Sequence, residues 1–276
     1  MSIWYTEKHT PHSGITIEVK KALYHAESPF QSIDVLDTYE FGKVLLLDGL
    51  VMLTERDEFV YHEMLAHVPL LTHPRPRNVL VVGGGDGGTV REVLKHATVE
   101  AVTLVEIDRM VVETSLEYLP EISAGLGDSR VSIVYEDGVK YLDQAADGTF
   151  DAILVDSTDP VGAAEALFSA DFFRSCRRAL TAQGVFASQT ESPFYHMAFM
   201  KEVSRRLSGI FGVSRFYFAP VTTYPSGNWS FVLGQMDPGA EPRLGDGASL
   251  ASRYYTPEIH TACFARPRFL VEALQE

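Results

Sequence analysis

The chain has 276 residues, of which 46% are hydrophobic, and a formal net charge of −14. This length suits one large domain or a domain with a small appendage, and the hydrophobic content is enough for a buried core, which excludes a disordered chain. The excess of acid argues against non-specific binding of nucleic acid. It is compatible with cationic small molecules, although solubility alone also accounts for it.

No apolar run approaches the ~20 residues that span a bilayer, and the N-terminus shows no secretory signal. The two cysteines, Cys176 and Cys263, are too few for a disulfide framework or for a four-ligand zinc site. We therefore expect a protein of the reduced cytoplasm that has no membrane and no nucleic-acid partner.

Residues 1–55 have the pattern of a small antiparallel sheet. Residues 15–20 alternate apolar and polar side chains, as a half-buried strand does, and residues 32–37 alternate less cleanly. The Asp48-Gly49 pair separates two apolar runs, 44–47 and 50–53. Asp-Gly in that position is a strong signal for a β-hairpin.

From Asp57 the periodicity becomes that of a helix, which we expect to end before Pro74. Strands and helices then alternate, which predicts an α/β domain with a parallel sheet covered on both faces. We take residues 1–55 as an N-terminal β-domain and residues 56–276 as the second domain. The expected strands are 79–82, 101–105, 131–134, 152–155, 185–188, 213–218 and 229–233; the expected helices are 89–96, 110–118, 139–144, 171–180 and 196–208; residues 237–247 are expected to form a surface loop.

A glycine-rich loop directly follows the strand 79–82 and opens a helix. Gly83, Gly85 and Gly88 fit the GxGxxG spacing, which allows a tight turn and a close approach of the backbone to a ligand. Glu106 ends the next strand, at about the spacing of an acid that binds a ribose, although a strand-end acid can simply be solvated. Two ligand classes fit: a dinucleotide, or an adenosyl sulfonium compound, which has a ribose but no phosphate.

Asp86, inside the glycine loop, favours the second class of ligand. A carboxylate in a phosphate cradle would repel the phosphate, but it would attract an ammonium group. The alternative reading is that Asp86 points to solvent or caps the helix that follows.

Further acids follow the third and fourth strands of the predicted parallel set, where open sheets bind their ligands. Asp137-Gly138 could accept the amino group of an adenine, or could be an ordinary turn. Asp156 and Asp159 lie on one short loop, and if they lie close together each raises the pKa of the other and lowers stability. This pair is therefore more plausibly functional than structural, the alternative being an Asp-Pro turn with Asp156 capping a helix.

We do not expect a metal site. A hard cation needs several oxygen ligands in one shell, and Asp86 comes from a different loop than Asp156 and Asp159. His62 lacks the second histidine, four positions on, that a zinc-binding helix requires. Aromatic residues such as Tyr61 and Tyr224, combined with acids, would suit a linear diamine, although aromatics are more often part of the core.

These features together resemble the spermidine synthases, the polyamine aminopropyltransferase family, over nearly the whole chain. The matching segments are WYTE at 4–7, LLDG at 46–49, DEFVYHEM at 57–64, GGGDGG at 83–88, VEID at 105–108, YEDG at 135–138, the loop 156–168 and TYPSG at 223–227. The resemblance implies a Rossmann-like, methyltransferase-type domain behind a small N-terminal β-domain, assembled as a homodimer or homotetramer. It implies transfer of an aminopropyl group from decarboxylated S-adenosylmethionine to putrescine, giving spermidine and 5′-methylthioadenosine, with no metal or redox cofactor.

The resemblance also implies residue roles. Asp156 resembles the general base, and Asp86 resembles the carboxylate that holds the amine of the donor. Residues that resemble the diamine site are Tyr61, His62, Asp86, Asp156, Asp159, Gln189 and Tyr224; those that resemble the nucleoside site are Gln31, Gly83, Gly85, Asp86, Glu106, Asp137, Gly138 and Ala163. Ala163 stands where the family usually has proline, which predicts a more mobile loop because proline restricts the backbone.

Other functions share part of this pattern. Agmatine, cadaverine or spermidine could replace putrescine as acceptor. A methyltransferase would share the glycine loop and Glu106, but it has no need of Asp86 opposite the carboxylate of its own donor. A dehydrogenase would bind NAD, and a non-catalytic polyamine-binding protein would not need the intact Asp156.

Overall fold

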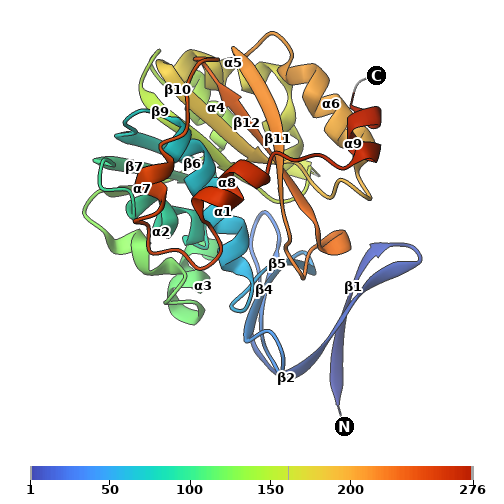
Figure 1. The fold of residues 1–276 in the computed structure, drawn as a ribbon. Helices are drawn as coiled ribbons and strands as arrows, with labels where there is room; N and C mark the ends of the chain where they lie inside the picture. Colours follow the sequence, from blue (N-terminus) through green and yellow to red (C-terminus); the bar gives the residue numbers. More distant parts are fainter. Residues whose placement is uncertain (1, 161, 275–276) are drawn as a thin grey trace.

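A computed structural model describes residues 2–160 and 162–274 and shows two β-sheets (Figure 1). The first is an antiparallel sheet with its strands in chain order: β1 (Ile3–Thr10), β2 (Ser13–Glu27), β3 (Ser32–Thr38), β4 (Lys43–Leu47) and β5 (Leu50–Thr54). The β4–β5 turn has positive φ angles at Asp48 (49°) and Gly49 (71°), as the Asp-Gly signal predicts. Strand β1 was not predicted.

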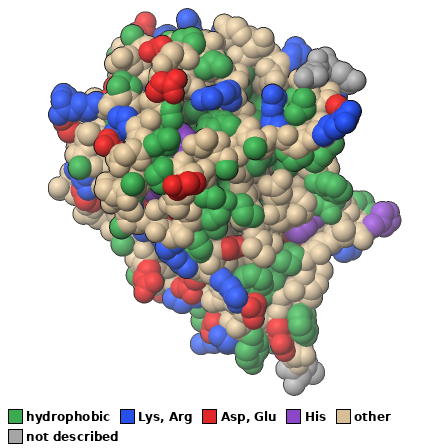
Figure 2. All heavy atoms as spheres, viewed as in Figure 1, with side chains coloured by type: hydrophobic (Ala, Val, Ile, Leu, Met, Phe, Trp, Pro, Cys, Tyr) green, Lys and Arg blue, Asp and Glu red, His purple; other side chains and the backbone are tan. Residues whose placement is uncertain are grey.

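The β1–β2 hairpin extends away from the rest of the molecule (Figure 1). The start of β1 exposes large apolar side chains, with Ile3 60% and Trp4 54% exposed. On the face shown in Figure 2, basic and acidic side chains are interspersed rather than gathered into one patch of either sign.

The second sheet has seven strands in the order β11-β12-β10-β9-β6-β7-β8. Its strands are β6 (Asn78–Gly83), β7 (Ala101–Glu106), β8 (Val131–Tyr135), β9 (Phe150–Asp156), β10 (Leu180–Gln189), β11 (Val213–Ala219) and β12 (Trp229–Gln235). Six strands are parallel, and β12 runs antiparallel to both β10 and β11. The fold class is confirmed, although the sheet is mixed: the β11–β12 connection is shorter than the dozen or so residues that a parallel crossover needs.

Helices cover both faces of the second sheet. Along β6, Val79 and Val81 pack into the core formed with α1 and α2, whereas Leu80 and Val82 face the core formed with α5 and α6. The helices are α1 (Glu58–Thr72), α2 (Gly88–Leu94), α3 (Arg109–Tyr118), α4 (Gly138–Gln144), α5 (Ala170–Ala179), α6 (Met197–Leu207), α7 (Leu244–Gly247), α8 (Pro257–Ala262) and α9 (Arg268–Ala273), with 3₁₀ turns at Ser123–Gly127, Gly162–Phe168 and Pro225–Gly227. The short helix α7 occupies the end of the segment 237–247 that was expected to be a loop.

The N-terminal sheet packs against α3 and the residues that follow it. Ile33, Val35 and Leu45 from the sheet form one apolar cluster with Val111 and Ile122. This contact brings the segment before β3 to the end of β7. We propose that the domain boundary lies at residue 55, between the two sheets.

In the described ranges, no helix combines the length and the apolar character that crossing a membrane requires. Cys176 and Cys263 are both free and buried.

Candidate active site

The glycine loop and Asp156 meet at the carboxyl edge of the second sheet. Strands β6 and β9 are neighbours, and Gly83 lies opposite Asp156 in their register. Gly83 has a φ of 77°, and a Cβ placed there would lie 2.2 Å from the backbone oxygen of Asp156. A side chain at this position would collide with β9, so glycine is required where the two segments touch.

The carboxylate of Asp156 is held by two hydroxyl groups. Tyr61 Oη donates to Asp156 Oδ1 at 2.9 Å, and Thr89 Oγ1 donates to Oδ2 at 2.6 Å. Burial raises the pKa of Asp156, as does the nearby charge of Asp86, whereas His62 and the two hydroxyl groups lower it; the net shift is upward. Sequence reasoning missed Thr89, which lies in the turn that opens α2.

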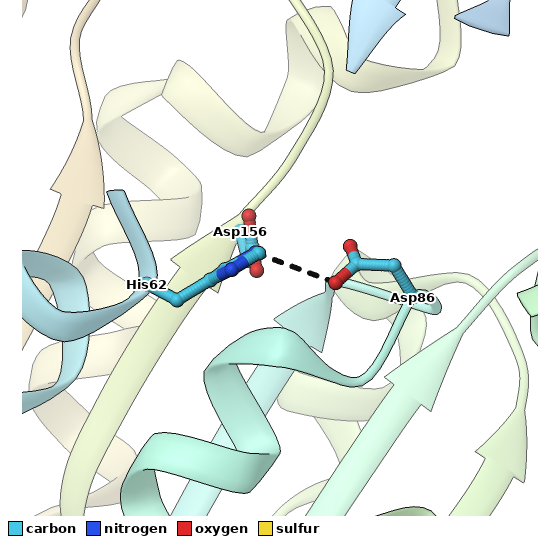
Figure 3. A group of neighbouring side chains, drawn as sticks. All are labelled: His62, Asp86 and Asp156. Carbon is cyan, nitrogen blue, oxygen red and sulfur yellow. Dashed lines mark ion pairs between the residues drawn. The ribbon is translucent and has the colours of Figure 1, made fainter. Parts of the chain in front are cut away.

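Asp86, His62 and Asp156 form one cluster (Figure 3). One potential ligand atom from each lies within 4.8 Å of the others, although the acids come from different loops. Asp86 Oδ1 lies 3.3 Å from His62 Nε2 and also accepts the backbone N–H of Gly88 at 2.8 Å. Asp86 therefore contacts the start of α2, as one reading predicted, and also faces the cluster. The expectation that no metal binds stays a prediction.

The charges of this cluster are set by burial and by its neighbours. Burial lowers the pKa of His62, but the carboxylates of Asp86 and Glu58 raise it, and the net value lies well above the ordinary one. Burial raises the pKa of Asp86, but His62 and the N–H of Gly88 bring it below its ordinary value. These shifts favour the protonated form of His62 and the ionised form of Asp86.

Glu106 is 8% exposed, so the reading of a solvated strand end is wrong. Its carboxylate accepts the backbone N–H of Gly85 at 3.1 Å and of Asp108 at 2.9 Å. Burial raises the pKa of Glu106 to about 7 against the opposing effect of these two bonds. Gln31 reaches the same place from the N-terminal sheet, where its Nε2 donates to Asp108 Oδ2 at 3.0 Å.

Asp137 caps helix α4, because its Oδ1 accepts the N–H of Val139 at 2.8 Å. Gly138 packs closely on the sheet: a Cβ there would lie 2.4 Å from Val82 Cγ1. Ala163 belongs to the 3₁₀ turn Gly162–Phe168, and its side chain lies outside the described part of the structure.

A small cavity of about 40 Å³ opens beside the cluster. It is lined by residues of both sheets and of the loop after β9: Glu7, Leu50, Val51, Met52, Tyr61, Ser157, Thr158, Asp159, Gln189, Tyr224, Pro225 and Trp229. Four of the predicted diamine residues are among them. The hydroxyl of Tyr224 donates to the backbone oxygen of Met52, which fixes its ring across the cavity.

Burial raises the pKa of Asp159 to about 8, and the charge of Glu191 contributes in the same direction. Each of Asp156 and Asp159 would raise the pKa of the other if the two carboxylates lay close together, but the leading charge contributions come from Asp86 for Asp156 and from Glu191 for Asp159. Glu191 is 2% exposed and has a φ of 69°, and His196 Nδ1 lies 2.9 Å from its Oε2. Sequence reasoning missed Glu191, since no motif in the sequence marks it.

The two sheets and the glycine loop define an α/β protein of the Rossmann-like class, and comparisons with known proteins define its family. The family profile of the spermine/spermidine synthase domain matches residues 58–241, and that of the spermidine synthase tetramerisation domain matches residues 3–55. The chain belongs to the spermidine synthase family of polyamine aminopropyltransferases.

The relatives match over all or nearly all of their own length. A polyamine aminopropyltransferase of Moorella thermoacetica is 50% identical over 99% of this chain and 96% of its own. One from Shouchella clausii is 47% identical over 100% of both chains. The crystal structure of spermidine synthase from Thermotoga maritima superposes with a TM-score of 0.94 at 41% identity, covering 99% of this chain and 94% of that one. A spermidine synthase in complex with the transition state analogue AdoDATO gives a TM-score of 0.95, also at 41% identity, covering 99% and 95%. The protein is a polyamine aminopropyltransferase.

Proposed function

We propose that this aminopropyltransferase uses putrescine as its acceptor and decarboxylated S-adenosylmethionine as its donor, and forms spermidine and 5′-methylthioadenosine. The observation that carries the proposal is the convergence of Asp86 and Asp156 between the glycine loop and a cavity walled by tyrosines. One carboxylate can hold an ammonium group of the donor while the other faces the attacking amine.

The donor would lie across the carboxyl edge of the sheet, with its ribose hydroxyls on Glu106 and its amine on Asp86. The nucleoside site proposed from the family pattern comprises Gln31, Gly83, Gly85, Asp86, Glu106, Asp137, Gly138 and Ala163. Asp86 would also select the decarboxylated donor, because the carboxylate of ordinary S-adenosylmethionine would meet a like charge there.

The acceptor would fill the cavity beside Asp156. The methylenes of a diamine pack on the rings of Tyr61 and Tyr224, and its far ammonium meets Asp159. His62 and Gln189 complete the proposed diamine site. Because burial raises the pKa of Asp159 to about 8, we expect an ammonium group to displace the proton of Asp159 when it binds near neutral pH.

The reaction is one in-line displacement. A neutral primary amine attacks the methylene carbon next to the sulfonium, a C–N bond forms, and the C–S bond breaks with its electron pair going to sulfur. The new ammonium loses a proton to Asp156, whose raised pKa makes it a better base than an ordinary carboxylate. Holding the reactants in line supplies much of the acceleration. The displacement balances without a metal or redox cofactor.

Competition between acceptors tests the choice of putrescine. The protein is incubated with decarboxylated S-adenosylmethionine that carries an isotopic label in its aminopropyl group and with an equimolar mixture of unlabelled putrescine, cadaverine, agmatine and spermidine, and the labelled products are separated by mass. We expect spermidine to dominate, because the proposed site places one amine of putrescine at Asp156 and the other at Asp159. A larger share of any other product would overturn putrescine as the acceptor but leave aminopropyl transfer intact.

Nucleoside binding should depend on pH through Glu106. Its pKa of about 7 in the free protein means that the ionised form, which accepts two ribose hydroxyls, gains population as the pH rises through 7. We expect the affinity for 5′-methylthioadenosine to increase severalfold between pH 6 and pH 8, and to lose this dependence in Glu106→Gln. Calorimetric titration at both pH values measures it, and a flat affinity in the unsubstituted protein would contradict the ribose role.

We further propose that the chain assembles as a homodimer or homotetramer in the cytoplasm. The match of residues 3–55 to a tetramerisation domain supports assembly, as do the exposed Ile3 and Trp4 of the projecting hairpin.

A further inference from the structure

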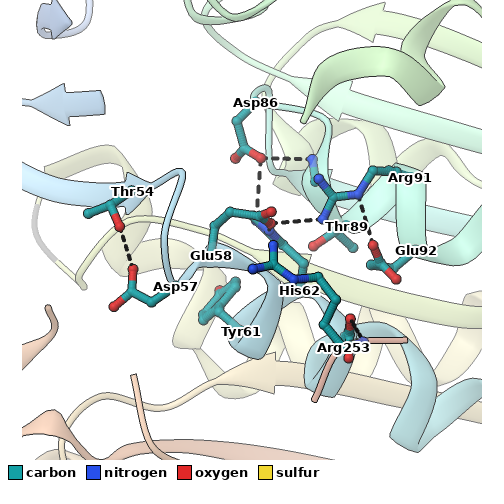
Figure 4. A network of polar contacts seen from close by, with 12 residues as sticks. Thr54, Asp57, Glu58, Tyr61, His62, Asp86, Thr89, Arg91, Glu92 and Arg253 are labelled. Carbon is teal, nitrogen blue, oxygen red and sulfur yellow. Dashed lines mark hydrogen bonds and ion pairs between the residues drawn. The ribbon is translucent and has the colours of Figure 1, made fainter. Parts of the chain in front are cut away.

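A series of alternating charges starts at Asp86 and continues along the facing sides of α1 and α2 (Figure 4). Beyond Asp86, His62 Nδ1 lies 2.5 Å from Glu58 Oε2. The same oxygen accepts from Arg91 Nη2 at 2.8 Å, and Arg91 Nε donates to Glu92 Oε1 at 2.8 Å. The interior members of this series, His62, Glu58 and Arg91, each have a partner of opposite charge on both sides.

The series of charged side chains is buried where it meets the active site. The side chains of His62 and Glu58 are 3% and 5% exposed. With a carboxylate at each ring nitrogen, His62 satisfies both partners only when both nitrogens carry a proton, because an ionised carboxylate accepts and cannot donate. A buried imidazolium between two carboxylates is therefore the arrangement that leaves no polar atom of this group unpaired.

Helices α1 and α2 bring these charged side chains together. Glu58 and His62 are four residues apart in α1, so they lie one turn apart on the same helix face. Helix α2 approaches this face closely: a Cβ on Gly88 would lie 2.3 Å from the His62 ring. Gly88 thus serves the packing of His62 as well as the glycine loop, and Arg91 follows on the next turn of α2.

We propose that Glu58 is a positioning residue: together with Arg91 it holds His62 as an imidazolium whose Nε2 forms an ion pair with Asp86, and so orients the carboxylate that receives the amine of the donor. The inference rests on the proposed function for the identity of that amine. It adds two residues, Glu58 and Arg91, that have no place in the nucleoside or diamine sites.

The effect on Asp86 follows from the charge of His62. The charged and titratable groups that face the imidazole are Glu58 on α1, Asp86 in the glycine loop and Asp156 at the end of β9, with the ring of Tyr61 beside it. If His62 became neutral with its proton on Nδ1, its Nε2 lone pair would face Asp86 Oδ1 at 3.3 Å. Two acceptors at that distance repel, so Asp86 would lose its ion-pair partner and keep the hydrogen bond from the N–H of Gly88.

Glu58→Gln removes the charge but keeps the shape. In the unsubstituted, ligand-free protein, the ring nitrogen NMR shifts of His62, assigned by their loss in His62→Gln, should be those of an imidazolium from pH 6 to pH 8. In Glu58→Gln the ring should titrate within this range, and kcat/KM for the donor should fall about 10-fold or more as the pH rises through it. Affinity for 5′-methylthioadenosine, which has no amine, should stay within about twofold.

Glu202→Gln provides the matched control. Glu202 lies on α6 and accepts from Arg205 and Arg206, so this substitution also removes a carboxylate paired with arginine, but at the surface. It should leave all three readouts unchanged. Glu58→Asp keeps the charge and should restore part of the pH-independent activity.

The outcomes separate this inference from the proposed function. A neutral His62 at pH 7.5 in the unsubstituted protein overturns the inference, even if Glu58→Gln does not fold. So does a Glu58→Gln variant whose donor kinetics keep the original pH profile, or one that loses 5′-methylthioadenosine binding in proportion to activity, since that indicates a merely structural role. Absence of aminopropyl transfer by the unsubstituted protein overturns the proposed function instead, and leaves the NMR result to be judged by itself.

Discussion

Replacing Asp156 with asparagine should lower kcat by roughly 10²–10⁴-fold, the range for a positioned general base. Asparagine keeps the size of the side chain; its oxygen can accept from one of the two hydroxyl groups of Tyr61 and Thr89, and its amide N–H can donate to the other, so the geometry around it should survive. It cannot take the proton from the new ammonium, however, and it does not stabilise the charge that develops on nitrogen. Steady-state kinetics with saturating donor and acceptor measure the effect.

Binding of 5′-methylthioadenosine to Asp156→Asn should remain close to that of the unsubstituted protein, since Asp156 faces the reacting amine. Asp143→Asn is a matched control, because Asp143 is an exposed aspartate on α4 whose carboxylate accepts from Ser175. It should leave kcat unchanged. A near-normal kcat in Asp156→Asn would show that another group, such as Asp159, accepts the proton.

Replacing Asp86 with asparagine should weaken binding of the decarboxylated donor by about 10- to 100-fold, because a charge-assisted bond to its ammonium is lost. The same change removes the like charge that faces the carboxylate of ordinary S-adenosylmethionine. The ratio of the two affinities should therefore move toward one. Competition of both nucleosides against labelled 5′-methylthioadenosine measures this ratio directly.

Asp86→Asn also removes one of the two carboxylates that keep His62 charged, so 5′-methylthioadenosine is the necessary reference ligand. Its affinity should change little if the glycine loop keeps its shape. An unchanged ratio between the two donors, with the reference ligand still bound, would mean that Asp86 does not face the amino end of the donor.

Much of the fold is predictable because its signals are local. The run Val79–Val82 before the glycines, and the Asp48-Gly49 turn, each mark an element without help from distant residues. Strand β1 was not predicted because most of its side chains are exposed or partly exposed. Its sequence therefore lacks the clear alternation of apolar and polar residues that a half-buried strand shows. The reversed direction of β12 could not be read from periodicity, because a strand has the same pattern in either direction.

Part of the candidate site could be predicted from the chemistry of single residues and from their position in loops after strands. Asp86 and Asp156 were singled out from the loops that follow two strands, and neighbouring strands bring such loops together. Their partners were not predictable in this way. Thr89, Glu58 and Glu191 act through contacts between elements far apart in the chain, and a threonine or glutamate at a helix start or strand end has many ordinary explanations.

The stoichiometry of one reaction tests aminopropyl transfer most directly. The purified protein is given decarboxylated S-adenosylmethionine and putrescine, and 5′-methylthioadenosine and spermidine are measured together over time. We expect the two products to form in equal amounts and neither to form when putrescine is left out. Release of 5′-methylthioadenosine without a matching polyamine, or methylation of the amine from ordinary S-adenosylmethionine, would contradict it.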